Sequence, residues 1–253
     1  MSTIKPIFLL ADSQLLFWRE EGGEPFLARA RKLMEQDAPE RPFKAAYLGA
    51  SNGDAPEFYD LFVAAMGEIG IRDCRMILSE PQPEDRSFLE EADLILLAGG
   101  DVALGWNIFE GTGLAAKVSE RYYAGALLLG VSAGAVQLGL KGWRESGGLF
   151  DTFRLVPFVI DAHDEPSWSR LGSVVAKAGE HARGFGIPTG GGALYHPDYS
   201  VEPVRHPLTE MTLTEEGVVR QALLFPGETA EATEEERGSF SPEVQELLNL
   251  PPN

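Results

Sequence analysis

Short apolar runs, each closed by a turn of small residues, dominate the first half of this 253-residue chain. The runs have the length of buried strands, and the segments between them carry apolar residues at helical spacing. Strands that alternate with helices favour a parallel sheet covered by helices on both faces. We therefore predict an α/β fold with a doubly wound, mostly parallel sheet. The predicted strands are residues 7–11, 44–48, 74–78, 93–98 and 126–131.

Two helices are predicted in this half from their apolar spacing. Residues 25–36 form the first. The second begins near Asp54, a candidate N-cap, with Pro56 in its first turn. Its apolar residues fall on one helical face, which we expect to be buried. They are Phe58, Leu61, Phe62, Ala65 and Met66.

Three of the turns are rich in glycine, alanine and serine. They are GASNGD at 49–54, AGGD at 98–101 and GVSAGA at 130–135. The carboxyl ends of parallel strands share one edge of the sheet, and active sites of open α/β sheets lie at that edge. We expect the three turns to meet there.

The second half of the chain is less regular. Residues 167–178 have helical spacing, and residues 241–248 predict a final helix. No linker or repeat divides the chain, so we expect a single domain over residues 1–253. Short strand candidates lie at 184–188, 193–196, 211–214 and 218–225.

The formal net charge of −18 argues against nucleic acid or an anionic membrane as a partner, because both attract basic surfaces. A small acidic substrate is compatible with it, since a few arginines can reverse the field inside one pocket. Cys74 is the single cysteine, so no internal disulfide can form. The N-terminal apolar run is too short for a signal peptide. We expect a cytoplasmic protein.

The most specific pattern is Gly130-Val131-Ser132-Ala133-Gly134, which lies between a predicted strand and a helix-like segment. That context is the one a nucleophile elbow requires. Small flanking residues permit the sharp turn that raises the serine clear of the sheet. The amide of Ala133 would then face a developing oxyanion. Ser132 is therefore the candidate nucleophile, and the alternative is a turn that merely needs small residues.

A serine nucleophile needs a base, and a base needs an acid that orients it. His163 directly follows a strand-like apolar run, which favours it over His181, His196 and His206. Glu145 is the candidate acid, because it lies in a loop between the serine and the histidine. Asp151, Asp161 and Asp164 compete with it for this role.

The second glycine-rich turn offers backbone amides that could complete an oxyanion hole, with Gly100 as the donor. A phosphate-binding loop is disfavoured, because the turn lacks the lysine and hydroxyl of a P-loop and the third glycine of a dinucleotide fingerprint. No histidine or cysteine cluster has metal-ligand spacing. The sequence predicts neither a cofactor nor a metal.

Together these motifs resemble the dipeptidase E and cyanophycinase family of serine peptidases. The resemblance rests on YLGASNGD, AGGD, GVSAGA and FDTFRLVPFVIDAHDE, in this order between residues 40 and 195. It implies a fold like that of class I glutamine amidotransferases and hydrolysis of aspartyl peptides without a metal. By position, Ser132 resembles the nucleophile and His163 the base. Gly100 and Ala133 resemble the oxyanion donors, and Glu145 is the nearest equivalent of the acid.

Some positions depart from the family's pattern. Val102 replaces the glutamine of cyanophycinases, which weakens the hypothesis that cyanophycin is the substrate. Asp101 stands where dipeptidase E has asparagine. Thr189 and Gly190 occupy the place of an acidic residue that usually follows the strand. Arg170 resembles an arginine near the substrate and is a candidate partner for a substrate carboxylate. Asp101 and Asp161 are the other candidate substrate-binding residues.

These observations predict a serine peptidase that hydrolyses aspartyl dipeptides or short peptides with N-terminal Asp. The alternatives are an exopeptidase acting on β-aspartyl bonds and a non-catalytic binding protein that retains the fold. A glutamine amidotransferase is disfavoured, because Cys74 lies in a predicted strand rather than at an elbow. The resemblance leaves monomer and homodimer open and slightly favours the homodimer.

Overall fold

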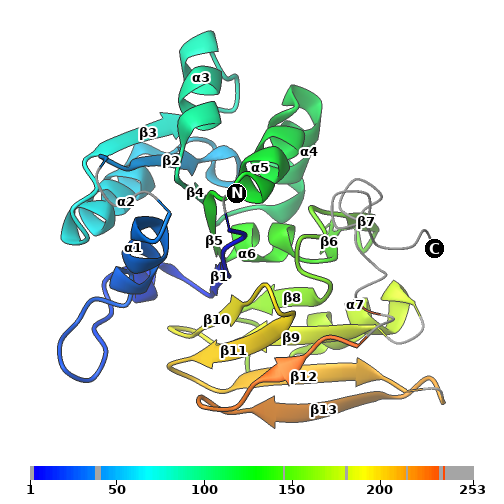
Figure 1. The fold of residues 1–253 in the computed structure, drawn as a ribbon. Helices are drawn as coiled ribbons and strands as arrows, with labels where there is room; N and C mark the ends of the chain where they lie inside the picture. Colours follow the sequence, from blue (N-terminus) through cyan, green and yellow to red (C-terminus); the bar gives the residue numbers. More distant parts are fainter. Residues whose placement is uncertain are drawn as a thin grey trace.

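The computed structural model describes residues 3–37, 41–144, 146–179, 182–214, 216–233 and 236. Helices and strands alternate along the first half, and strands dominate the second (Figure 1). The strands are β1 (Ile7–Leu10), β2 (Lys44–Leu48), β3 (Asp73–Ile77), β4 (Leu94–Leu97), β5 (Leu127–Val131), β6 (Lys141–Trp143), β7 (Leu149–Asp151), β8 (Val159–Ala162), β9 (Arg183–Ile187), β10 (Gly192–Tyr195), β11 (Ser200–Val204), β12 (Leu208–Leu213), β13 (Val219–Leu224) and β14 (Ala230–Glu231). The helices are η1 (Ser13–Leu16), α1 (Ala28–Glu35), η2 (Ala50–Asn52), α2 (Pro56–Glu68), α3 (Pro83–Glu91), α4 (Val102–Thr112), α5 (Leu114–Tyr123), α6 (Ala133–Leu138) and α7 (Ser169–Ala178).

Among the described residues, the main sheet has the strand order β14-β11-β10-β1-β5-β4-β2-β3. Its strands from β1 to β3 in this order are parallel to one another, and β10, β11 and β14 add an antiparallel extension. The predicted fold class, a mostly parallel sheet flanked by helices, is confirmed. The five strands predicted for the first half all form, within one or two residues of their predicted bounds.

Alternating side chains of the main sheet supply two hydrophobic cores, one on each face. In β1, Ile7 and Leu9 belong to the core on the α4, α5 and α6 side. Phe8 and Leu10 belong to the core covered by α1 and α2. A strand buried on both faces reads as a continuous apolar run, which is why the sequence predicted it well.

The helix that follows β2 differs from its prediction in two ways. Ala55, not Asp54, is the N-cap of α2. Asp54 has a φ of 60°, and its Oδ2 accepts a hydrogen bond from the Ser79 amide at 2.8 Å. Its carboxylate therefore binds the loop after β3. The expected buried face is also only partly buried, since Phe58 and Leu61 are 47% and 41% exposed.

A second sheet, of order β13-β12-β9-β8, lies beside the first and was not predicted (Figure 1). Its β8 and β9 are parallel and its other pairs antiparallel. Helix α7 packs on it through Leu171 and Val175, which belong to a third buried cluster. This sheet places the segment after β8 beside the carboxyl ends of β4 and β5.

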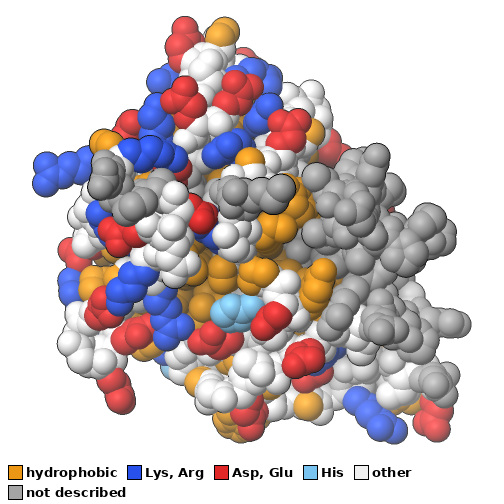
Figure 2. Space-filling view, in the orientation of Figure 1, with side chains coloured by type: hydrophobic (Ala, Val, Ile, Leu, Met, Phe, Trp, Pro, Cys, Tyr) orange, Lys and Arg blue, Asp and Glu red, His pale blue; other side chains and the backbone are white. Residues whose placement is uncertain are grey.

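The predicted final helix at 241–248 lies outside the described residues. None of the described helices has the length and apolarity needed to cross a membrane. The molecular face in Figure 2 carries acidic and basic side chains interspersed around an area of hydrophobic ones.

Candidate active site

Ser132 occupies a strained turn between β5 and α6, with φ 49° and ψ −109°. This conformation is rare for residues other than glycine, and such strain clusters at functional sites. The flanking glycines are needed for space. A methyl group on Gly130 would lie 2.6 Å from the Ala135 nitrogen, and one on Gly134 would lie 2.1 Å from the Leu97 carbonyl oxygen. The turn therefore has the geometry of the predicted nucleophile elbow.

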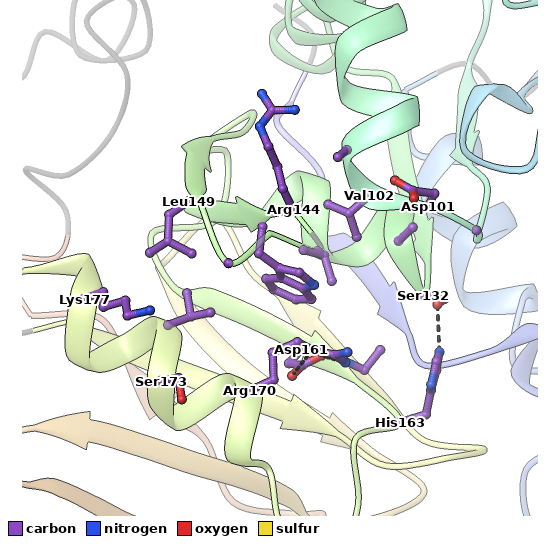
Figure 3. A pocket seen from close by; sticks show the side chains of 18 residues that line it. Asp101, Val102, Ser132, Arg144, Leu149, Asp161, His163, Arg170, Ser173 and Lys177 are labelled. Carbon is purple, nitrogen blue, oxygen red and sulfur yellow. Dashed lines mark hydrogen bonds and ion pairs between the residues drawn. The ribbon is translucent and has the colours of Figure 1, made fainter.

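The imidazole of His163 lies directly against this serine. Ser132 Oγ and His163 Nε2 are 2.8 Å apart, within hydrogen-bond distance (Figure 3). His163 follows β8 with a φ of 47°, and its amide donates to the Ile187 carbonyl at 2.9 Å. The geometry suits proton transfer from the hydroxyl to the ring.

The turn after β4 lies against the turn after β2, as predicted. Gly100 has a φ of 130°, and a methyl group on it would lie 2.1 Å from the Ser51 carbonyl oxygen, which also accepts from the Asp101 amide at 2.8 Å. Within the described part of the chain, nothing accepts a hydrogen bond from the amide of Gly100 or of Ala133. Both donors are therefore available to a bound group near Ser132.

A buried polar network, which the sequence did not predict, joins these turns to the elbow helix. Gln137 of α6 is fully buried, and its Nε2 donates to Ser51 Oγ at 3.1 Å and to the Val102 carbonyl at 2.9 Å. Gly105 of α4 leaves the room for it, since a methyl group there would lie 2.1 Å from Ser51 Oγ. The network ties the start of α4, at Val102, to α6 through Gln137.

A cavity of about 450 Å³ opens beside Ser132 and His163, and Arg170 forms part of its wall. Arg170 donates from Nη2 to Asp161 Oδ1 at 2.6 Å and from Nε to Asp161 Oδ2 at 3.0 Å. Its guanidinium also lies 4.8 Å from the centre of the Trp143 ring. The arginine is thus held on two sides, and no described residue accepts a hydrogen bond from its Nη1.

Asp161 is fully buried in β8, and both of its carboxylate oxygens accept hydrogen bonds from Arg170. Burial raises the pKa of its carboxyl, and the hydrogen bonds and charge of Arg170 oppose that rise. The cavity wall also contains Asp101, whose Oδ1 caps α4 by accepting from the Leu104 amide at 2.8 Å. The second oxygen of Asp101 is left for other partners.

Two further cations line the cavity and were missed in the sequence. Lys177 lies on the same side of α7 as Arg170 and Ser173, at the end of the cavity away from Ser132 (Figure 3). Arg144 directly follows β6, and its guanidinium lies 4.9 Å from the centre of the Phe150 ring. The spacing from Arg170 to Lys177 is seven residues, two helical turns, which could have indicated a shared face. Among the described residues, the charged side chains that line the cavity are Arg144, Arg170, Lys177, Asp101 and Asp161. Within this described part of the wall, positive charge exceeds negative charge, in a chain of net charge −18.

The candidate acids that the structure describes do not contact the ring of His163. Glu145 lies outside the described residues. Asp151 pairs with Lys141 at 2.6 Å, Asp161 with Arg170, and Asp164 accepts from the Arg170 amide at 3.3 Å. Among the described carboxylates, none hydrogen-bonds the His163 ring.

A different carboxylate, Glu165, reaches the turn after β9. Its Oε1 accepts from the Thr189 amide at 2.6 Å, and its Oε2 accepts from the Thr189 hydroxyl at 3.3 Å. These bonds join the loop that carries His163 to the turn after β9.

The other reactive side chains lie elsewhere. His196 Nε2 is 3.0 Å from Glu202 Oε2, and His206 follows β11. His181 lies outside the described residues. Cys74 lies in β3, and burial raises the pKa of its thiol to about 11, so the thiolate is scarce at neutral pH. The described residues contain no group of three or more side chains that could hold a metal ion.

Comparison with known proteins identifies the family. The model of peptidase family S51 matches residues 21–190, well over half of the chain. The chain belongs to peptidase family S51. The enzyme class predicted from the sequence, a serine peptidase, is thereby confirmed. The S51 match covers Ser132, His163, Arg170 and all three glycine-rich turns.

Solved structures support the fold of this S51 peptidase. A peptidase from an acI-B1 actinobacterium superposes with a TM-score of 0.66 at 16% identity, covering 90% of this chain and 97% of the other. A protein assigned to peptidase E from Listeria monocytogenes EGD-e superposes with a TM-score of 0.52 at 15% identity, covering 88% and 100%. At these identities the likeness concerns the fold alone. No curated protein matches the chain significantly.

Proposed function

We propose that this S51 peptidase hydrolyses aspartyl dipeptides or short peptides with N-terminal Asp, with Ser132 as nucleophile and His163 as general base. The observation that carries the proposal is the 2.8 Å approach of Ser132 Oγ to His163 Nε2 at a strained elbow beside a cavity rich in cations. The name of the Listeria relative, peptidase E, agrees with it.

In the proposed reaction, His163 takes the hydroxyl proton as Ser132 Oγ attacks the carbonyl carbon of the substrate. The amides of Gly100 and Ala133 stabilise the oxyanion of the tetrahedral intermediate. His163 then gives its proton to the leaving amine, and an acyl-enzyme remains. Water, deprotonated by the same imidazole, hydrolyses the acyl-enzyme and regenerates the serine.

The acidic side chain of the substrate is proposed to bind Arg170. Asp161 and Trp143 hold the guanidinium in place, so little conformational freedom is lost when a carboxylate binds Nη1. Because Asp161 balances much of the arginine's charge, we infer that Lys177 and Arg144 add to the attraction from further along the cavity. Asp101 is placed to bind the free amine of the substrate through its unused oxygen.

The identity of the third triad member stays a prediction. Glu145 is proposed as the acid that orients His163, and its contacts lie outside the described residues. Glu165 acts on the same loop through Thr189 and supports the backbone rather than the ring.

The experiment compares hydrolysis of Asp-Leu and Asn-Leu by the wild-type enzyme and by Ser132→Ala. The two substrates are nearly equal in size, but asparagine has a neutral amide in place of the carboxylate. We therefore expect kcat/KM to favour Asp-Leu by about tenfold to a hundredfold, the effect of a charge-assisted hydrogen bond. Ser132→Ala should abolish both reactions. Equal rates for wild type and Ser132→Ala would refute the proposed nucleophile, and equal rates for the two substrates would refute the proposed specificity.

An exopeptidase that acts on β-aspartyl bonds is the second candidate. The observation that favours it is the length of the cavity, which continues from Arg170 to Lys177 and could take an α-carboxylate as well as the reacting side chain. Comparing α- and β-linked Asp-Leu separates the two candidates. The cytoplasmic location and the homodimer remain predictions, and sedimentation of the purified protein would test the latter.

A further inference from the structure

A second pocket of about 250 Å³ lies on the other side of the catalytic pair. It shares Gly100, Ser132 and His163 with the cation-rich cavity. The cavity lies toward α4, α6 and α7, whereas this pocket lies toward α2 and η1. We call it the α2 pocket. Its lining side chains are mostly apolar, and they include Leu16, Tyr47, Phe58, Leu61, Phe62, Leu96 and Val131.

The rim of the α2 pocket exposes large apolar side chains that a helix would normally bury. Phe58 and Leu61, on the face of α2 expected to be buried, are 47% and 41% exposed. Phe62, one turn further along the same face, is 1% exposed and belongs to the core. The apolar face of α2 therefore runs from the core out to the pocket, where it has no partner among the described residues.

The charge of the α2 pocket contrasts with that of the cavity. No lysine or arginine is among its described lining residues. Apart from His163, the acidic side chain among them is that of Asp12. That carboxylate is fixed by the amides of Gln14 at 2.8 Å and Gly190 at 2.7 Å. An acidic side chain would meet no cation here and would face a carboxylate, whereas an apolar side chain would displace water from apolar walls.

We propose that the α2 pocket binds an apolar side chain of the residue whose amine leaves, immediately after the scissile bond. This inference rests on the proposed function. If the aspartyl carboxylate binds Arg170, the acyl part of the substrate lies in the cavity, and the leaving group must lie on the other side of Ser132 Oγ. His163 lines both pockets, as a group that protonates the leaving amine must.

The size of the pocket agrees with a single side chain. Its volume of about 250 Å³ is below the range of roughly 300–1,000 Å³ of pockets that enclose drug-sized ligands. The inferred substrate class is therefore aspartyl peptides in which a large apolar residue, such as leucine or phenylalanine, follows the aspartate.

The test compares Asp-Phe-NH₂ with Asp-Gly-NH₂, which share the acyl group and differ in the side chain offered to the pocket. We expect the wild-type kcat/KM to favour Asp-Phe-NH₂ by about tenfold or more, because discrimination in apolar pockets amounts to about tenfold or more for each group that fits. The double variant Phe58→Ser/Leu61→Ser should bring this ratio towards one. Val63→Ser is the matched control, since Val63 is also on α2 and 38% exposed but does not line the pocket, and it should keep the wild-type ratio.

The outcomes separate this inference from the proposed function. Equal hydrolysis of both amides by the wild type, or an unchanged ratio in the double variant, would overturn the α2 pocket's role and leave the aspartyl peptidase intact. An equal loss of the ratio in Val63→Ser would overturn it as well. Hydrolysis of neither amide by the wild type would contradict the proposed function and this inference with it.

Discussion

Ser132 Oγ and His163 Nε2 lie 2.8 Å apart, although the two residues follow strands of different sheets. Ser132 follows β5 of the main sheet, and His163 follows β8 of the four-stranded sheet. The catalytic distance therefore depends on how the two sheets pack as well as on the elbow itself.

Gly134→Ala should destabilise the protein by about 1–3 kcal/mol or more, because the added methyl group would lie 2.1 Å from the Leu97 carbonyl oxygen in a packed turn. Gly111→Ala is the control. Gly111 lies in α4 with no atom within 4 Å of an added methyl group, and alanine is the better helix former, so we expect a gain of about 0.5–1 kcal/mol. Thermal unfolding measures both. A Gly134→Ala protein as stable as wild type would contradict the close packing of the elbow.

Gln137→Leu should impair catalysis by displacing the turn that contains Gly100, the proposed oxyanion donor. The substitution removes the donor to the Val102 carbonyl and leaves Ser51 Oγ without that partner. We expect kcat to fall about tenfold to a hundredfold, as small displacements of catalytic groups do, while KM changes little. Stability should fall by about 1–3 kcal/mol, the cost of buried unpaired polar groups. A loss of stability with an unchanged kcat would show that Gln137 supports the fold alone.

Arg170→Ala should make stability depend more strongly on pH. Burial already raises the pKa of Asp161, and loss of Arg170 removes the contacts that oppose this rise. A carboxyl with a raised native pKa binds more protons when folded, so stability declines as pH rises from the unfolded pKa through the native one. At pH 8 the free energy of unfolding of the variant should be lower than that of the wild type by up to about 3 kcal/mol, because the charge of Asp161 is then buried and unpaired. At pH 5 the difference should be smaller.

Thermal unfolding from pH 4.5 to 8 measures this effect. The control is Asp161→Asn/Arg170→Ala, which removes the titrating group and should remove the added pH dependence. A deficit in Arg170→Ala that is the same at every pH would contradict the role assigned to this ion pair.

Glu165→Ala should lower kcat, because the Glu165 carboxylate joins the His163 loop to the Thr189 turn. Glu165→Gln keeps an oxygen that can accept from the Thr189 amide, so it should retain most of the wild-type kcat. Steady-state kinetics on Asp-Leu measures both variants. If Glu165→Gln were as impaired as Glu165→Ala, the negative charge itself, rather than the contact with Thr189, would be the important property.

Local features of the fold were accessible from the sequence. The strands of the parallel sheet are buried on both faces and read as apolar runs, and the elbow is encoded by neighbouring residues from Gly130 to Gly134. His163 was found because it follows such a run. Whether a residue lies at the end of a strand depends on its neighbours in the chain, so it can be predicted from the sequence alone.

Long-range partners were not accessible. Nothing in the sequence separates β8 and β9 from the main sheet, and the hydrogen bonds of Gln137 to Ser51 and Val102 join residues 86 and 35 positions apart. Phe58 and Leu61 were expected in the core because periodicity shows that a helical face is apolar, not how far the core extends beneath it. The pairing of Arg170 with Asp161 was missed for the same reason, although both residues had been identified.

The most direct test of the central claim, that His163 activates Ser132, is the rate at which a fluorophosphonate modifies the protein, with the labelled peptide located by mass spectrometry. The comparison is between wild type and His163→Asn, since asparagine tolerates the positive φ of 47° at this position without supplying a comparable base. We predict a single adduct on Ser132 in the wild type and a rate about a hundredfold or more lower in His163→Asn, in line with the usual contribution of a general base. Equal rates in the two proteins, or an adduct on a residue other than Ser132, would contradict it.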